Sequence, residues 1–406
     1  VFARETVTVM GVWGGVELEA FEKVMETFEA ATGIEVEFEG TRDLPTLLTT
    51  RIEAGNPPDI VVLTGLGMMN DLANDGVLVE LSNVLDMKKF AEEYNPVWRE
   101  LATYEGGLYG LYISADVKSL VWYNPKAFAA NGYEVPGTWE ELEALSKRMI
   151  ADGNIPWSVG MESGAASGWP GTDWIEDIML RTAGPEVYDQ WVNHDIPWTD
   201  ARVKRAFEIF GSIVRDEAYT WGGPIAVNAT NFNDAVAPLF MDPPQAFMHR
   251  QASFITSTIR ENNPNLVAGE DYDFFPFPPI EEEYGTPVLG AADMVSLLTE
   301  KPAAKQFMRF LATPGAQSIW VGELGKIGVN KRINPNVYPD ELTAKMAAVL
   351  QDATVFRFDG SDSMPGAVGS GAFWTGIVDY VNGEDLDSGK HPVLNDLKFV
   401  RINQHL

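Results

Sequence analysis

The chain of 406 residues contains no cysteine and only four histidines. The lack of cysteine excludes disulfides, thiol nucleophiles and cysteine-ligated zinc, but it leaves the compartment open. No two of His194, His249, His391 and His405 lie at the spacing of metal ligands. We therefore expect neither a metal site nor a cofactor.

Basic residues are also few. There are 29 of them against 59 acidic residues, which gives a net charge of -30. The negative electrostatic field of this charge repels phosphate backbones, so we expect no nucleic-acid partner. It disfavours anionic membrane surfaces as well. A solvated acidic surface is the simplest explanation of the charge.

Long apolar runs are missing. No stretch approaches the 18 residues that would indicate a transmembrane helix. The first letters, VFARETVTV, lead directly into a strand pattern, so no signal segment is visible. An exported protein would have lost that segment by processing. The length is enough for two domains, each with its own core.

Motifs of nucleotide binding and of hydrolysis are absent. The sequence has no G-x-S-x-G elbow, no P-loop, and no G-x-G-x-x-G after its first strand. A glycosidase would need two carboxylates at a set separation, and a sequence supplies no distances. A glycoside hydrolase therefore stays open as an alternative, with these candidate carboxylates: Glu17, Asp43, Asp116, Asp173 and Asp293.

The first hundred residues alternate between strand and helix patterns. TVTVMGVW and IEVEF alternate apolar residues as strands do, and PPDIVVL is typical of a buried strand. Helices between them carry apolar stripes, the first with Leu18, Phe21, Val24, Met25 and Phe28, and it ends at a glycine. Strand–helix–strand order with short connections predicts a parallel-type α/β sheet.

The pattern changes near residue 112, where longer helical segments begin. Thr138 and Glu141 form a capping box before one helix. Another helix is predicted over DARVKRAFEIFGSIV, and a single helix over KPAAKQFMRFLATPGAQSIW. The stretch ESGAASGWPGTDW between helices is predicted to be an ordered loop. We infer a second, more helical lobe.

Several of the 12 tryptophans are predicted to lie in glycine-rich loops rather than on helical stripes. Trp13 follows the first strand, Trp169 lies in SGWPG, and Trp374 follows GSGAF. Aromatic faces beside carboxylates suit sugars, whose C–H faces are apolar and whose edges are hydroxyls. Packing in a core is the competing explanation for each ring.

The segment AFMHRQASF places three polar residues in a strand-like apolar run. Polar groups at the end of a buried strand must pair or face a cavity. We expect His249, Arg250 and Gln251 to lie at the floor of a ligand cleft.

The order of these segments resembles the extracellular solute-binding proteins of ABC transporters. Within that family it is most similar to the carbohydrate-binding, maltose-binding-protein-like group and its alpha-glucoside-binding branch. The resemblance spans essentially the whole chain. It rests on VWGGVELEAFEKVMETFEAATGIEVEF, RIEAGNPPDIVVL, LVWYNPKAFAANGYEVPGTWEEL, AFMHRQASF, GAADMVSLL and FDGSDSMPGAVGSGAFWTGIVDYVNG.

The resemblance implies an α/β periplasmic-binding-protein fold of two lobes with a hinge and a ligand cleft between them. The first lobe would take residues 1–111 and 290–327, and the second 112–289 and 328–406. Ligand would close the hinge, and the membrane permease subunits of an ABC importer would recognise the closed form. The protein would be a periplasmic or membrane-associated extracellular monomer.

The resemblance also implies ligand contacts at the cleft-facing segments. Where many relatives have a Gly-Ser/Pro-Trp turn, this chain has His-Arg-Gln, so its contacts are expected to differ there. Structural ion pairs compete for the arginines. The implied contacts are Trp13, Glu17, Arg42, Asp43, Thr64, Asp116, Trp169, Asp173, His249, Arg250, Gln251, Asp293 and Arg357.

The function that follows is capture of an alpha-glucoside or short oligosaccharide without catalysis. The alternatives are the glycoside hydrolase named above and a related binder of a non-sugar ligand.

Overall fold

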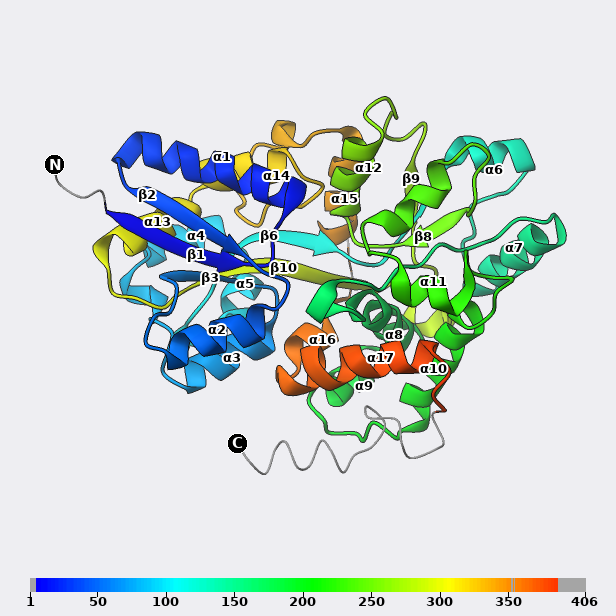
Figure 1. Ribbon diagram of the computed structural model, residues 1–406, viewed down its shortest axis with the longest axis horizontal. Helices are drawn as coiled ribbons and strands as arrows, with labels where there is room; N and C mark the ends of the chain where they lie inside the picture. Colours follow the sequence, from blue (N-terminus) through cyan, green and yellow to red (C-terminus); the bar gives the residue numbers. More distant parts are fainter. Residues whose placement is uncertain (1–4, 352, 354, 386–406) are drawn as a thin grey trace. The chain divides into compact units, whose positions relative to one another are not determined.

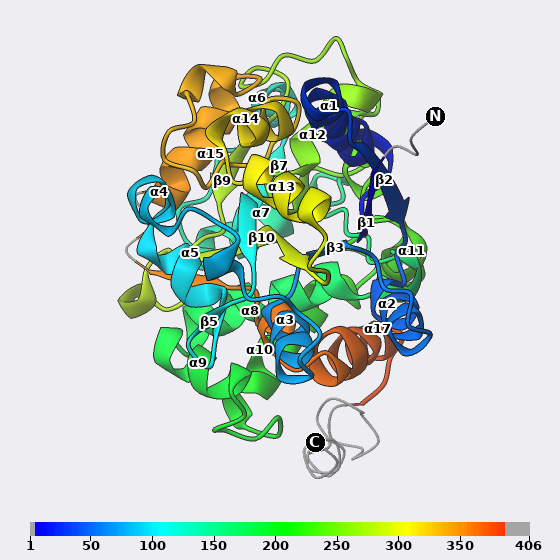
Figure 2. The ribbon, with the colours of Figure 1, turned by 90° about the vertical axis from the view of Figure 1, so that its left-hand side faces the viewer.

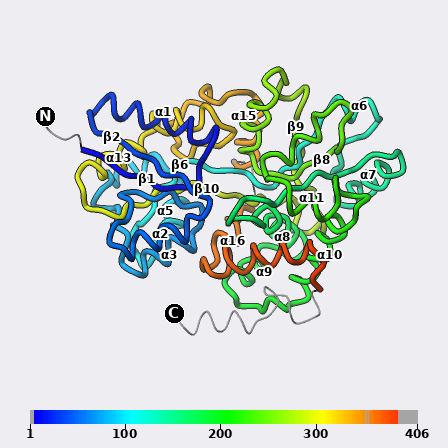
Figure 3. The backbone as a smooth tube through the Cα atoms, viewed as in Figure 1, coloured from blue at the N-terminus to red at the C-terminus, as the bar shows by residue number. Residues whose placement is uncertain are grey.

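The computed structural model describes residues 5–351, 353 and 355–385, and they form two compact units. Unit 1 takes residues up to 116 together with 291–344, and unit 2 takes 117–290 together with the residues from 345 onward. The chain passes between the units within β6 (Leu111–Val117), β10 (Val288–Leu297) and α15 (Glu341–Gln351), and Figure 3 traces this path. The resemblance described above predicts these passages after residues 111, 289 and 327.

The sheet of unit 1 has the parallel centre that the sequence predicts. Strand β1 (Thr6–Gly11) pairs in parallel with β2 (Glu35–Gly40) on one side and with β3 (Ile60–Leu63) on the other. Strand β10 runs antiparallel to β3. Helix α1 (Gly15–Thr32) lies on one side of β1 and β2, and α2 (Leu44–Glu53) lies on the other (Figures 1 and 2). This is an α/β layer structure.

Helix α1 buries most of the stripe predicted for it, from Phe21 to Phe28. Leu18 is only half-buried, and Ala20 is buried instead. The helix ends at Gly33, whose φ of 74° is the left-handed conformation that glycine adopts at low cost. The Phe28 ring packs 4.8 Å from the Phe307 ring of α13 (Pro302–Leu311).

The prediction of one helix over residues 301–320 is wrong. Helix α13 stops at Leu311, and a separate α14 (Pro314–Gly322) follows. Thr313 caps the second helix, because its hydroxyl accepts a hydrogen bond from the Ala316 N–H at 3.2 Å. Pro314 has no N–H to continue the first helix, but it fits the first turn of a new one.

Unit 1 contains further short elements. They are α3 (Leu66–Asn74), α4 (Met87–Glu93), α5 (Pro96–Leu101), β4 (Thr103–Tyr104), β5 (Gly107–Leu108), and the 3-10 turns at Leu81–Asn83 and Pro335–Val337.

Unit 2 surrounds a small antiparallel sheet with helices. Strand β7 (Leu120–Tyr123) lies between β8 (Met248–Arg250) and β9 (Asp273–Pro276), with Trp122 opposite His249. Strand β11 (Phe356–Phe358) pairs in parallel with the start of β10. Helix α8 (Trp169–Thr182) is buried from Pro170 to Arg181, so it is the centre of this unit.

Two predictions for unit 2 need correction. Residues 162–174 are not a loop, because a 3-10 turn at Gly164–Ala166 is followed by α8, which begins at Trp169 itself. Pro170 does not interrupt this helix, since proline is well accommodated in the first helical turn. Trp374 likewise begins a helix, α17 (Trp374–Val381).

The other helices of unit 2 pack around α8 and the sheet. Both the capping of α7 by Thr138 and the buried stripe of α10 confirm the sequence patterns. The elements are α6 (Pro125–Asn131), α7 (Trp139–Ala151), α9 (Pro185–Val192), α10 (Ala201–Val214), α11 (Gly223–Ala229), α12 (Ile255–Asn262), α16 (Gly360–Ser363), the π-type turn Ala367–Phe373, and 3-10 turns at Asp234–Phe240 and Glu282–Tyr284.

Within the described part of the chain, every helix is too short or too polar to cross a membrane.

Candidate ligand-binding site

The carboxyl ends of β1, β2 and β3 meet at one edge of the unit 1 sheet, because the three strands are parallel. Open sheets bind ligands at this edge. Trp13, Arg42 and Thr64 each follow one of these strands. The Arg42 guanidinium donates to the Val12 carbonyl at 3.2 Å, which ties two of the loops together. A Cβ atom at position 40 would lie 2.7 Å from the Trp13 carbonyl oxygen, so the close approach of these two loops requires glycine at this position.

Trp13 is 2% exposed. Its ring stacks on Phe38 at 5.8 Å and 10°, and it lies 4.4 Å from Trp320. Packing in this aromatic cluster holds the Trp13 ring in place when no ligand is bound. Asp43 is exposed at the N-terminal end of α2, where its backbone N–H donates to the Thr41 hydroxyl.

Lys326 brings together three of the predicted contacts in unit 1. Its ammonium lies 3.1 Å from Glu17 in the first turn of α1, 3.5 Å from Asp116 in β6, and 2.5 Å from Asp293 in β10. Asp293 also accepts from the Ser114 hydroxyl at 2.9 Å. We call Lys326, Glu17, Asp116 and Asp293 the Lys326 cluster.

Electrostatics hold the Lys326 ammonium in its charged form. Burial would lower the pKa of Lys326, but the carboxylates of Asp293, Asp116 and Glu17 outweigh it and raise the pKa well above its usual value. Three carboxylates face one ammonium, so the cluster carries excess negative charge. Ionised carboxylates are pure acceptors and suit a ligand that offers hydroxyl donors.

The equivalent lysine in unit 2 is Lys118. It donates to Asp173 at 2.8 Å and also pairs with Asp359. Asp173 is fully buried on α8, and the next turn of that helix brings Glu176. The Glu176 carboxylate accepts from the N–H groups of Gly360 and Ser361, both at 2.9 Å.

These buried carboxylates influence one another. Burial raises the pKa of Asp173 to about 7, with Asp359 adding to the rise while Lys118 and Arg250 oppose it. Burial and the neighbouring Asp359 and Asp173 likewise raise the pKa of Glu176 well above its usual value. Four buried carboxylates, counting Asp177, lie beside Lys118 and the two arginines described next.

The carboxylates of Asp173, Glu176 and Asp359 lie within 4.8 Å of one another, as metal ligands would. The Lys118 ammonium already pairs with two of the three. It takes the place that a metal ion would need, so this donor set does not fit a metal.

The arginine of β8 is tied to the same helix. Arg250 pairs with Asp177 and lies 3.6 Å from Asp173. Asp177 also accepts from Arg181 and from the Ser119 hydroxyl, at 2.8 and 2.6 Å. These additional hydrogen bonds stabilise the buried ion pair of Arg250 and Asp177. The pair explains why the buried strand β8 contains an arginine.

The neighbours of Arg250 lie on the other side of β8. His249 is buried, and its Nδ1–H donates to the Ser158 carbonyl at 2.8 Å. Burial, together with the nearby Arg250, lowers the pKa of His249 to about 4, so the ring is neutral. Gln251 uses its carbonyl oxygen to accept from the Ala252 N–H. Among the described residues, His249 Nε2 and Gln251 Nε2 have no hydrogen-bond partner.

Trp169 has more packing partners than the flanking glycines predict. Its half-buried ring lies edge-on to Phe232 at 5.2 Å, and Phe254 is 6.1 Å away. The Lys118 ammonium lies 5.2 Å from the ring centre. No acceptor for the buried indole N–H is present in the described part of the chain.

Arg357 in β11 binds a carboxylate of its own unit. Its Nε and Nη2 donate to Asp189 at 2.6 and 2.9 Å, and its Nη1 donates to the Phe356 carbonyl. Both side chains of the pair are about a third to a half exposed, at 32% and 45%.

Two lysines that organise these clusters are not among the residues predicted from the sequence. Lys118 had a usable signal, because it lies two residues after Asp116 within the apolar run LYISADVKSLVWY. Opposite charges inside a buried strand indicate pairing. Lys326 lies in GELGKIGVN, where no periodicity marks it as buried.

Two α/β units joined by chain that passes between them three times are the architecture of two-domain solute-binding proteins. Solved structures show the same fold. One is the bacterial solute receptor AcbH, with a TM-score of 0.83 and 21% identity over 99% of this chain and 100% of that one. Another is the maltose-bound MalE3 of T. maritima, with a TM-score of 0.77 and 17% identity over 97% and 99%.

Sequence comparisons identify the family. The family model for bacterial extracellular solute-binding proteins matches residues 14–318. The osmoprotective compounds-binding protein GgtB of Synechocystis is 47% identical over 94% of this chain and 90% of its own length. The alpha-glucosides-binding periplasmic protein AglE of Rhizobium meliloti is 42% identical over 97% and 88%.

The chain therefore belongs to the bacterial extracellular solute-binding proteins. It is a binding protein and not an enzyme, which removes the glycoside hydrolase alternative. The family places it outside the cytoplasm.

Proposed function

We propose that the protein captures an alpha-glucoside or a short alpha-linked oligosaccharide and delivers it to the permease of an ABC importer. The observation that carries this proposal is the similarity to AglE, named for alpha-glucosides, over nearly the full length of both chains. Membership of the family supports a transported solute as the ligand. The choice of an alpha-glucoside is the part that we propose here.

The chemistry of unit 1 supports a polyhydroxylated ligand. Glu17 keeps a quarter of its side chain exposed while it pairs with the buried Lys326. Its carboxylate is therefore the member of the Lys326 cluster that we propose accepts from sugar hydroxyls. The other contacts proposed for this unit are Trp13, Arg42, Asp43, Thr64, Asp116 and Asp293.

In unit 2 we propose Trp169 as the main contact. A half-buried indole with an unused N–H can stack on one sugar face and donate to one hydroxyl. Lys118, through its contact with the ring, fixes the position of Trp169. The other contacts proposed for this unit are Asp173, His249, Arg250, Gln251 and Arg357.

A second candidate ligand is an osmoprotective compound. The similarity to GgtB, at 47% identity, favours it. The two candidates coincide if the osmoprotectant is itself an alpha-glucosyl compound, for example a glucosylated polyol.

We also propose that ligand binding closes a hinge. Strands β6 and β10 each continue from one unit into the other, so a small change of backbone angle at these passages would move one unit as a rigid body. The protein is proposed to act as a monomer, and the closed form is the one that the permease would recognise.

A thermal-shift panel tests the ligand class. It contains trehalose, sucrose, maltose and glucosylglycerol as alpha-glucosides, cellobiose as the beta-linked control, and glycine betaine as a non-sugar osmoprotectant. A ligand at a hundredfold excess over its Kd stabilises the native state by about 2.7 kcal/mol. We expect a shift with at least one alpha-glucoside and none with cellobiose. A shift with glycine betaine alone would contradict the proposal.

A further inference from the structure

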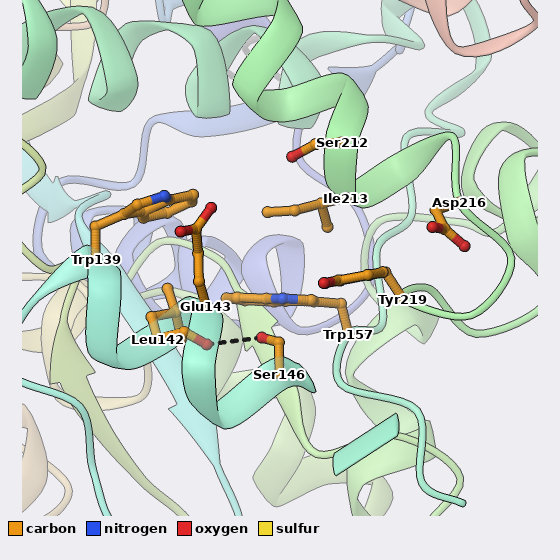
Figure 4. A pocket seen from close by; sticks show the side chains of 9 residues that line it. All are labelled: Trp139, Leu142, Glu143, Ser146, Trp157, Ser212, Ile213, Asp216 and Tyr219. Carbon is orange, nitrogen blue, oxygen red and sulfur yellow. Dashed lines mark hydrogen bonds between the residues drawn. The ribbon is translucent and has the colours of Figure 1, made fainter. Parts of the chain in front are cut away.

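Unit 2 contains a cavity of about 260 Å³ that includes none of the ligand contacts proposed above. Its walls come from α7, from α10 and from the segments around Trp157 and Tyr219 (Figure 4). Backbone hydrogen bonds fix the last two segments to each other, since the Trp157 N–H donates to the Tyr219 carbonyl at 2.9 Å. This hydrogen bond fixes the relative position of two walls of the cavity.

Three aromatic side chains line the cavity, and two of them are held in position by other aromatic rings that pack against them. Trp139 stacks on Phe277 at 5.6 Å with an angle of 29° between the rings. Trp157 is 1% exposed and lies edge-on to Trp174 at 5.0 Å. The third is Tyr219. Aromatic faces held in this way attract cations through their negative quadrupole.

The charged groups that line the cavity are both carboxylates. Glu143 and Asp216 are exposed carboxylates on its wall, and no basic residue lines it. Figure 4 shows the Glu143 carboxylate directed to the side where the two indoles lie. The hydroxyls of Ser146 and Ser212 donate within their own helices, to carbonyls at 2.9 and 2.7 Å. Their free lone pairs are left as acceptors.

The surroundings of Tyr219 show the same negative field. Burial raises the pKa of its phenol, and the carboxylates of Asp216 and Glu143 add to the rise. The two carboxylates therefore act on one point of the cavity from two different segments, Glu143 from α7 and Asp216 from the turn after α10.

We propose that this cavity binds a small organic ammonium cation. The rings contact the alkyl groups of the cation, and the two carboxylates neutralise its charge. A neutral sugar could contact the same rings and acceptors, but it would leave the charge of the two carboxylates uncompensated. The site is independent of the sugar site proposed above.

Choline and its uncharged isostere 3,3-dimethylbutan-1-ol are the probes, and saturation-transfer NMR on the full chain is the measurement. Loss of the cation–aromatic and carboxylate interactions is worth about tenfold in affinity or more. We expect choline to bind and the isostere to bind at least about tenfold more weakly. Equal binding of the two probes, or no transfer to choline, would overturn the proposal.

Variants locate the binding. The double variant Glu143→Gln with Asp216→Asn should weaken choline binding by about tenfold. Both residues are exposed, so the fold should be retained. Glu140→Gln is the matched control, because Glu140 is an exposed carboxylate on the same helix that does not line the cavity.

Two outcomes of the variants would overturn the site. One is an equal effect of Glu140→Gln and the double variant, which would indicate general charge screening. The other is competition between D-glucose and choline, together with weaker binding of D-glucose to the double variant. This result would make the cavity a sugar site. Saturating amounts of the alpha-glucoside found in the thermal-shift panel should leave choline binding unchanged.

Discussion

Lys326 Nζ lies 2.5 Å from the carboxylate of Asp293, and neither side chain is more than 5% exposed. The same ammonium reaches Glu17 and Asp116, so one cation joins α1, β6 and β10. Strands β6 and β10 are two of the places where the chain leaves unit 1. Lys326 therefore links three of the proposed ligand contacts to the two strands in which the chain leaves unit 1.

Replacing Lys326 by methionine should destabilise unit 1. The change leaves the buried carboxylates of Asp116 and Asp293 without their cation, and breaking such a pair costs about 3–5 kcal/mol. Urea unfolding measures it. The control is Lys23→Met, which removes an exposed pair with Glu323 in the same unit and should cost about 0–1 kcal/mol. Equal losses in the two variants would mean that the cluster is not held by Lys326.

His249 should make the stability of unit 2 fall in acid. Its pKa is about 4 in the folded chain, against about 6.5 when unfolded, so the unfolded state binds a proton first as the pH falls. Stability is then lost between pH 6.5 and 4, by about 3 kcal/mol in all. Asp173, with its pKa raised to about 7, acts in the opposite direction, since its contribution is lost as the pH rises.

Comparison with His249→Asn isolates the histidine. Asparagine keeps a donor for the Ser158 carbonyl but does not titrate. The difference in unfolding free energy between the two proteins should shrink or change sign as the pH falls from 6.5 to 4. A difference that stays constant over this range would show that His249 is not neutral and buried.

Trp169 should contribute to ligand affinity in two separable ways. Trp169→Ala removes stacking worth about 1 kcal/mol and buried area worth about 1.5–3 kcal/mol, which is about a hundredfold in affinity or more. Trp169→Phe keeps a ring but removes the indole N–H, so it should cost only about tenfold. Titration calorimetry with the ligand from the thermal-shift panel gives both values.

The same variants distinguish binding from packing. The Trp169 ring contacts Phe232 and Phe254, so some stability is lost with it. Folded Trp169→Ala protein that binds as tightly as the parent would make Trp169 a structural residue.

Ligand should reduce the radius of gyration of the protein. The proposed hinge closure at β6 and β10 would bring the two units closer together. Small-angle scattering with and without ligand measures the change in radius of gyration. Trp169→Ala at the same ligand concentration is the control, because it should stay in the unliganded form. An unchanged radius with saturating ligand would indicate a rigid, preformed site.

The fold of unit 1 could be predicted because local pattern and tertiary structure agree there. The alternation in TVTVMG and the stripe ending at Gly33 both survive in β1 and α1. The apolar spacing continues through Pro314 and therefore predicts one helix. The helical hydrogen bonds cannot continue there, because proline has no N–H.

The site was harder to predict, because partners came from distant parts of the chain. Arg250 meets Asp177 across 73 residues, and Lys118 meets Asp359 across 241. No local pattern encodes such pairs. The glycines around Trp169 predict a loop, but Gly168, at a φ of 107°, forms the turn from which α8 starts.

Titration calorimetry of the purified protein with maltose, trehalose and sucrose, each compared with beta-linked cellobiose, tests the central claim most directly. We predict saturable binding of at least one alpha-glucoside with one site per chain, and at least about a hundredfold weaker binding of cellobiose. Equal affinity for alpha- and beta-linked sugars, or binding of glycine betaine and of none of the sugars, would contradict it.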